Sequence, residues 1–197
     1  MENCIEIINA RFNEELQQQI DGILPKGHVY KLGFPSEALL SNMKYAPIEL
    51  SAGRLDKKSK QRNHLFDLSE IKNLPKAVNN PIMVFESTDK DGTTIVLTEL
   101  KDKSGYNFVV AIRIRYDYQT RINQAEVNDI RSIYPKDHFE GVLDWINSTD
   151  KLLKWTNKEK AFDFIQSQSP EGLEPGIKAK ANFTTKILQN FENPKFL

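Results

Sequence analysis

Four extended segments in a row between residues 79 and 136 constrain the fold of this chain more than any other feature. Glycine-containing turn sequences, Asp89–Gly92 and Asp102–Gly105, join the first three. A longer polar link over residues 117–126 leads to the fourth. The segments lie at residues 79–87, 93–101, 107–116 and 127–136. Consecutive strands joined by such turns predict an antiparallel meander.

Alternation along the third segment predicts two different faces for this sheet. Phe108 and Ile112 fall on one face, whereas Arg113 and Arg115 fall on the other. A sheet of this kind is expected to be covered by helices on one side only, with the arginine face looking outward. Strict alternation in the fourth segment likewise places three residues on one face: Ile130, Ser132 and Tyr134.

Helical patterns lie before and after these segments. Apolar spacing predicts a helix over about residues 4–21, and Ser51 is expected to cap a basic helix over 52–62. Asp67 and Glu70 have the spacing of a capping box. The further elements expected are extended pieces at 28–32 and 47–50, a short helix at 37–42, a capped helix opening at Asp137, a strand or tight turn at 152–155, and a helix over 158–166.

These elements predict an α+β fold, with N-terminal helices packed on a four-stranded antiparallel β-meander and C-terminal helices after it. We expect an N-terminal helix within residues 1–27 and the α+β domain over 28–166. Residues 167–197 are expected to form a linker and a short docked helix, because Ser, Pro, Gly and Glu dominate the stretch after 167.

The composition excludes several classes of protein. Lys and Arg number 27 and so do Asp and Glu, so nucleic acid would need a local basic patch. A single cysteine, Cys4, excludes an internal disulfide framework and a zinc cluster of several thiolates. No apolar run reaches transmembrane length and the N-terminus lacks a signal-peptide pattern, so a cytoplasmic location without a membrane partner is expected. His28 and His138 lack ligand-like neighbours, and we expect no metal and no cofactor.

Short phrases along the chain resemble the C-terminal domain of phage MuF-type proteins. They are Leu32–Ser36, Pro47–Ser51, Asn63–Glu70, Asn80–Ile82, Leu97–Leu100, Asn107–Ala111, Ser132–Asp137, Asn157–Ala161 and Asn190–Lys195. The resemblance covers roughly residues 30–166 and the tail. That domain is similar to phage nucleases related to barnase, EndoU, the tRNA-cutting colicins and RelE. The resemblance therefore implies a phage- or prophage-derived, toxin-like endoribonuclease that cuts RNA without a metal.

Such an enzyme makes the RNA 2′-hydroxyl attack the adjacent phosphorus, which requires a base, an acid and donors for the charged phosphorane. His64 is the first catalytic candidate, because histidine exchanges protons near neutral pH, and Glu99 is a second base candidate. Ser132 and Tyr134 are catalytic candidates that would position the scissile group. The candidate phosphate ligands are Arg54, Lys101, Arg113, Arg131 and Lys136.

Each candidate also has a structural interpretation. His64 suits a surface or capping role, Glu99 suits a cross-strand charge pair, and Tyr134 suits a half-buried strand position. The basic run over 54–62 is more typical of a solvated helix face than of an RNA-binding surface. The alternative function is a non-catalytic protein-binding module, an inhibitor or assembly factor, with an immunity or phage protein rather than RNA as its partner. Zero net charge and the apolar tail over 183–191 favour it.

Overall fold

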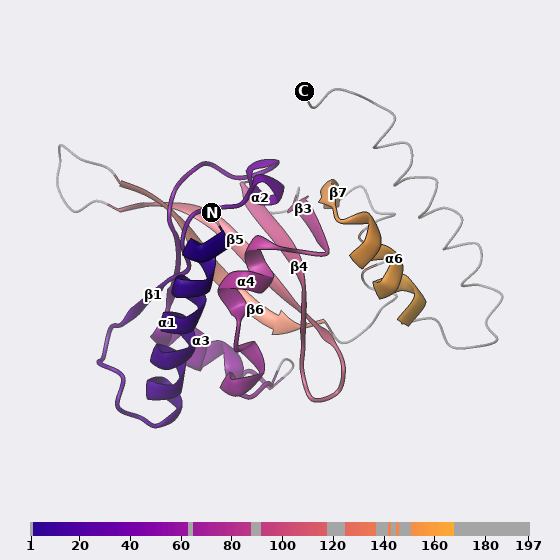
Figure 1. The fold of residues 1–197 in the computed structure, drawn as a ribbon. Helices are drawn as coiled ribbons and strands as arrows, with labels where there is room; N and C mark the ends of the chain where they lie inside the picture. Colours follow the sequence, from indigo (N-terminus) through magenta and orange to yellow (C-terminus); the bar gives the residue numbers. More distant parts are fainter. Residues whose placement is uncertain are drawn as a thin grey trace.

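The computed structural model describes residues 2–62, 65–87, 92–117, 125–136, 142, 145 and 151–167. The elements, shown in Figure 1, are α1 (Glu2–Ile20), β1 (Val29–Lys31), α2 (Glu37–Leu40), β2 (Ile48–Ser51), α3 (Ala52–Ser59), the 3-10 helix η1 (Leu68–Ile71), α4 (Leu74–Asn79), β3 (Met83–Ser87), β4 (Thr93–Lys101), β5 (Asn107–Asp117), β6 (Ala125–Pro135), β7 (Lys151–Thr156) and α6 (Lys158–Ser167). The predicted capping box at Asp137 and the predicted tail helix lie outside the described residues.

Seven strands form one mixed sheet in the order β1-β2-β6-β5-β4-β3-β7. The predicted segments β3 to β6 pair antiparallel in sequence order at its centre. The expected four-stranded sheet is nevertheless too small, because β2 adds parallel to β6, β1 adds to β2, and β7 adds to β3. The extra strands have only three to six residues each, so their own patterns do not show which sheet they join.

A β-bulge interrupts β6 and changes which of its residues share a face. The register pairs Ser132 and Ile130 with consecutive residues of β5, so Arg131 has no partner on that strand. The expectation that Ile130, Ser132 and Tyr134 share one face is therefore wrong. Ile130 and Ile133 both enter one hydrophobic core, whereas Tyr134 packs against the other.

Two hydrophobic cores cover opposite faces of the sheet. In the first core, Phe12 and Leu16 of α1, Leu55 of α3 and residues of α4 pack on one face. Each such side chain contributes about 1.5–3 kcal/mol when fully buried. In the second core, Ala161 and Ile165 of α6 pack on β3 and β4. The expectation of helices on one side only is thus wrong at the β4-β3-β7 end, where α6 lies beside β7 (Figure 1).

Polar contacts fasten α1 to the start of α4. Asn73 adopts a left-handed conformation, with φ of +67°. Asn9 and Asn13 donate to its side-chain oxygen at 2.7 and 3.0 Å, and Asn13 accepts from its backbone N–H at 2.9 Å. The first helix is therefore part of the body of the protein.

The predicted helix caps are present. The Ser51 hydroxyl accepts from the Arg54 backbone N–H at 3.4 Å, and Glu70 accepts from the backbone N–H of Asp67 at 3.1 Å. Asn157 accepts from a backbone N–H in the first turn of α6 at 3.1 Å. These caps set where the helices begin, and the one at Ser51 places Arg54 in the first turn of α3.

Candidate functional site

The face of β5 that carries Arg113 and Arg115 looks outward, as predicted. Arg113 is exposed and the Arg115 side chain is 39% exposed, whereas Phe108 and Ile112 are buried in the first core. Of the described helices, α6 contributes to the second core, and it does so over β3 and β4. Among the described residues, the part of this face around Arg113 and Arg115 is exposed. Toward the other end of the same two strands, Val109 and Tyr134 pack in the second core.

A buried carboxylate, Asp129, lies among the arginines on this surface. It stands opposite Arg113 in the β5–β6 ladder, and its side chain is only 4% exposed. Arg54 Nη1 donates to its Oδ1 at 2.6 Å, and Arg131 Nη1 donates to its Oδ2 at 2.8 Å. Arg115 Nε lies 3.9 Å from Oδ2. This pairing offsets the cost of removing a carboxylate from water.

Arg54 reaches this carboxylate at the point where two strands separate. β2 pairs with β6 only at Asn128 and Asp129. Just beyond, the Ile130 carbonyl accepts a second bond from Arg54 Nη1 at 2.6 Å. One guanidinium thus satisfies both the carboxylate and a backbone acceptor beside the bulge, which joins α3 to the sheet.

Glu49 is a second buried carboxylate, next to Asp129 across the parallel ladder. Its Oε1 accepts from Lys31, and its Oε2 accepts from Arg115 Nη2 at 3.2 Å. Arg115 therefore lies between the two carboxylates and joins their contacts into one network.

We refer to this network, together with Arg113 opposite Asp129, as the basic cluster. Its members are Lys31, Glu49, Arg54, Arg113, Arg115, Asp129 and Arg131. Five cations and two carboxylates leave an excess of three positive charges on an outward face. Arg113 is the member for which the described residues provide no hydrogen bond or ion pair, so its guanidinium faces solvent. Such a surface attracts and orients anions, phosphodiesters above all.

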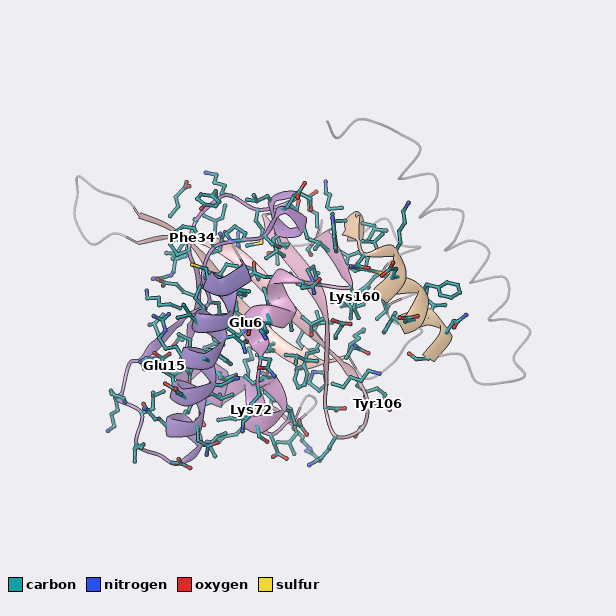
Figure 2. All side chains as sticks on the ribbon, viewed as in Figure 1. Glu6, Glu15, Phe34, Lys72, Tyr106 and Lys160 are labelled. Carbon is teal, nitrogen blue, oxygen red and sulfur yellow. The ribbon has the colours of Figure 1, made fainter. Side chains whose placement is uncertain are left out.

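Two predicted residues of β4 lie far from the basic cluster. Thr93 is the β4 partner of Arg113, and six residues along the strand separate it from Glu99. At 3.4 Å per residue this separation is about 20 Å. Glu99 instead contacts Lys160 of α6 at 2.5 Å, and Lys101 is exposed at the end of the strand. Figure 2 shows Lys160 on the α6 side of the molecule.

The other predicted residues divide between the two ends of the sheet. Arg54, Arg113 and Arg131 belong to the basic cluster, and Ser132 follows Arg131 on β6. By contrast, Tyr134 packs on the second core. Lys136 places its ammonium 4.8 Å from the centre of the Trp145 ring, a cation–π contact. His64 lies outside the described residues, so its role remains a prediction.

The residues of the basic cluster that the prediction missed are Lys31, Glu49, Arg115 and Asp129. The signal available in the sequence was the alternation of charged residues in two strands, Arg113 with Arg115 and Asp129 with Arg131. Glu49 comes to the site through a parallel pairing across about 80 residues of chain, which no local pattern reveals.

A separate polar group joins α1 to β1. His28 Nε2 lies 3.1 Å from Glu15 Oε2, and the His28 ring packs edge-on against Tyr30. The Tyr30 hydroxyl donates to Gln19. Burial, with the charge of Glu15 as a second cause, raises the pKa of Tyr30 well above its ordinary value. The group lies on the first-core side of the sheet, since Tyr30 belongs to that core.

Neither a metal-binding cluster nor a membrane-spanning helix is found among the described residues. No three histidine, cysteine or acidic side chains lie together in a metal-binding arrangement among them. No helix within the described ranges combines the length and the hydrophobicity needed to cross a bilayer.

The fold and its charged face define an α+β domain with a mixed sheet and one outward basic surface. The family model of the phage MuF C-terminal domain matches residues 55–163, more than half of the chain. The chain belongs to this family. The match begins within α3, so Arg54, Glu49 and Lys31 precede it, whereas Arg113, Arg115, Asp129 and Arg131 lie inside it. No curated protein and no solved structure matches the chain.

Proposed function

We propose that the chain is a phage- or prophage-derived, toxin-like endoribonuclease that cleaves RNA through attack of the 2′-hydroxyl without a metal. The observation that carries the proposal is the basic cluster, an outward surface on which buried carboxylates hold arginines in place. A phosphodiester bound there would contact Arg113 first, because this side chain is exposed and is bound by no other described residue. The half-exposed Arg131 would contact the same phosphate.

The arginines would supply the electrostatic part of the reaction. Cleavage builds negative charge on the phosphorane, and a planar guanidinium can donate two bonds to phosphate oxygens. Asp129 fixes Arg131 and Glu49 fixes Arg115, so these donors need little reorganisation when the charge develops. Fixed donors are the ones that favour a transition state over the bound substrate.

Proton transfer would use a carboxylate of the same surface. A general base must lie within hydrogen-bond reach of the hydroxyl that it deprotonates. For a phosphate held by Arg115, Glu49 is a nearby carboxylate, because the two side chains are 3.2 Å apart. Glu99 is distant, at about 20 Å from the row of Arg113. We therefore propose Glu49 as the base, which gives the role of acid to His64, the residue predicted to act as either base or acid.

The test is RNA cleavage by the purified protein. Wild type should produce new fragments from total RNA, and Arg113→Ala should cut about 10²- to 10³-fold more slowly, the usual effect of removing one transition-state donor. Lys72→Ala is the matched control, because Lys72 is an exposed cation away from the basic cluster and should behave as wild type. Equal activity of Arg113→Ala and Lys72→Ala would contradict the proposal, and so would intact RNA with the wild-type protein.

A non-catalytic protein-binding module is the second candidate function. The observation that favours it is the separation of Glu99 from the arginines, since the predicted catalytic residues do not gather in one place. The same experiment decides between the two functions. A binding module leaves RNA intact at every protein concentration, and its cluster variants differ only in how they bind a protein partner.

A further inference from the structure

Two exposed aromatic rings stack on each other beside the start of β2. The ring centres of Phe34 and Tyr45 are 5.0 Å apart, with 21° between the ring planes. Despite this contact Phe34 is 51% exposed and Tyr45 is 72% exposed. Single exposed apolar residues are ordinary, but two large rings that stack in solvent form a flat aromatic surface with no evident role in the core.

The backbone holds Phe34 firmly in this place. The preceding residue, Gly33, has a φ of +88°, a conformation that other residues adopt rarely. A Cβ at Gly33 would lie 2.9 Å from Ile8 of α1, so the turn also packs closely against the helix. The Gly33 carbonyl accepts from the Ile48 backbone N–H at 2.7 Å. The ring therefore projects from a rigid turn.

The aromatic pair lies close to the basic cluster along the chain. Phe34 follows Lys31 by three residues, and Tyr45 precedes Glu49 by four. In extended chain these separations span about 10–13 Å. Figure 2 shows Phe34 near the end of the sheet from which β5 and β6 project, away from α6 and Lys160. Asn128, the residue before Asp129, donates to the Lys44 and Ala46 carbonyls at 3.0 and 2.7 Å, so the segment that carries Tyr45 is held beside β6 and the basic cluster.

We propose that Phe34 and Tyr45 form a stacking platform for an unpaired base of the RNA that the basic cluster holds. This inference rests on the proposed function and adds a substrate class, single-stranded RNA. Every base has a π-face that stacks on an aromatic ring, whereas the bases of a duplex are already stacked and paired. The excess positive charge of the neighbouring cluster favours a polyanion over an apolar protein segment as the occupant.

The experiment measures binding of a short fluorescent uridine oligonucleotide, with an abasic oligonucleotide of the same length as the second probe. Tyr45→Ala should weaken binding of the uridine probe by about five- to a hundredfold, the range for loss of one stacked base, and leave the abasic probe unchanged. Tyr45→Phe keeps the ring and should restore affinity. Tyr106→Ala removes an exposed tyrosine in the β4–β5 turn and is the matched control.

The outcomes separate this inference from the proposed function. Arg113→Ala should weaken both probes, since it removes a phosphate contact. If wild type and Tyr45→Ala bind uridine RNA equally well, the stacking platform is refuted. RNA binding by the basic cluster is then still supported, and a protein partner would explain the exposed rings. A loss of the same size on both probes also refutes stacking. If wild type binds neither probe, the proposed function and the platform fail together.

Discussion

Replacing Asp129 by asparagine tests whether the basic cluster is held together by its buried carboxylate. Asparagine keeps the shape of the side chain and removes its charge, which leaves Arg54 and Arg131 without their anionic partner. Breaking a fully buried ion pair in this way costs about 3–5 kcal/mol. The Arg54 side chain is 28% exposed and that of Arg131 is 51% exposed. Hydration of these two guanidinium groups therefore offsets part of the destabilisation. We expect the free energy of unfolding to fall by about 2–3 kcal/mol.

Urea unfolding gives this quantity, and the same strand provides the control. Glu126 of β6 pairs with Lys44 at 2.6 Å, but both side chains are substantially exposed. Glu126→Gln should therefore cost less than about 1 kcal/mol, and added salt should shrink that cost further. The cost of Asp129→Asn should persist in high salt, because screening acts weakly on a buried carboxylate.

Two results would refute this reasoning. If Asp129→Asn and Glu126→Gln lower the free energy of unfolding equally, burial does not strengthen the ion pairs of Asp129. In a double-mutant cycle with Arg54→Met, an interaction energy near zero would show that Asp129 does not act through Arg54. We expect a coupling of about 1–3 kcal/mol, since the two side chains share one contact.

Two further predictions concern the packing of α1. Tyr30→Phe removes a buried hydroxyl that donates to Gln19 and should cost about 1 kcal/mol at neutral pH. Because burial and Glu15 raise the pKa of Tyr30 in the folded protein, the stability that this group contributes is complete below about pH 10 and is lost as the pH rises further. Urea unfolding from neutral to alkaline pH should therefore show a shallower decline for Tyr30→Phe than for wild type. Gly33→Ala should lower the free energy of unfolding by about 1–3 kcal/mol, because a positive φ and a contact at 2.9 Å coincide. Gly22 also has a positive φ, but the space around it is open. Gly22→Ala should therefore lower the free energy of unfolding by less than Gly33→Ala does.

The sequence predicted the centre of the sheet because the evidence there is local. Turn residues and alternating side chains specify β4 and β5 without reference to the rest of the chain. The same alternation correctly predicted that Arg113 is exposed and Phe108 is buried. The bulge at Arg131 has no such signature, since an extra residue in a strand looks like any other residue. One inserted position was enough to move Ser132 and Tyr134 away from the face expected for Ile130.

The composition of the candidate site depended on contacts that no local pattern contains. Arg54 was placed in a basic helix, but only the separation of β2 from β6 shows that its side chain meets Asp129. Glu99 was predicted as a base candidate, with a cross-strand charge pair as the structural alternative. Its partner is instead Lys160, which follows β7 in the chain. Cross-sheet and helix-to-sheet contacts of this kind are set by the tertiary packing of residues far apart in sequence.

For the ribonuclease that we propose, Glu49 and Glu99 are the two carboxylate candidates for the general base. If the reaction takes place at the basic cluster, Glu49→Gln should lower the rate of RNA cleavage by about 10²-fold or more, as expected for loss of a general base. Glu99→Gln should change it less than about twofold, because that side chain lies about 20 Å from the row of Arg113 and contacts Lys160 instead. Single-turnover cleavage of one oligonucleotide measures both rates, and thermal unfolding confirms that each variant is folded. The opposite order, a large loss for Glu99→Gln and a small one for Glu49→Gln, would move the reaction to the α6 end of the sheet and leave the basic cluster as a structural network.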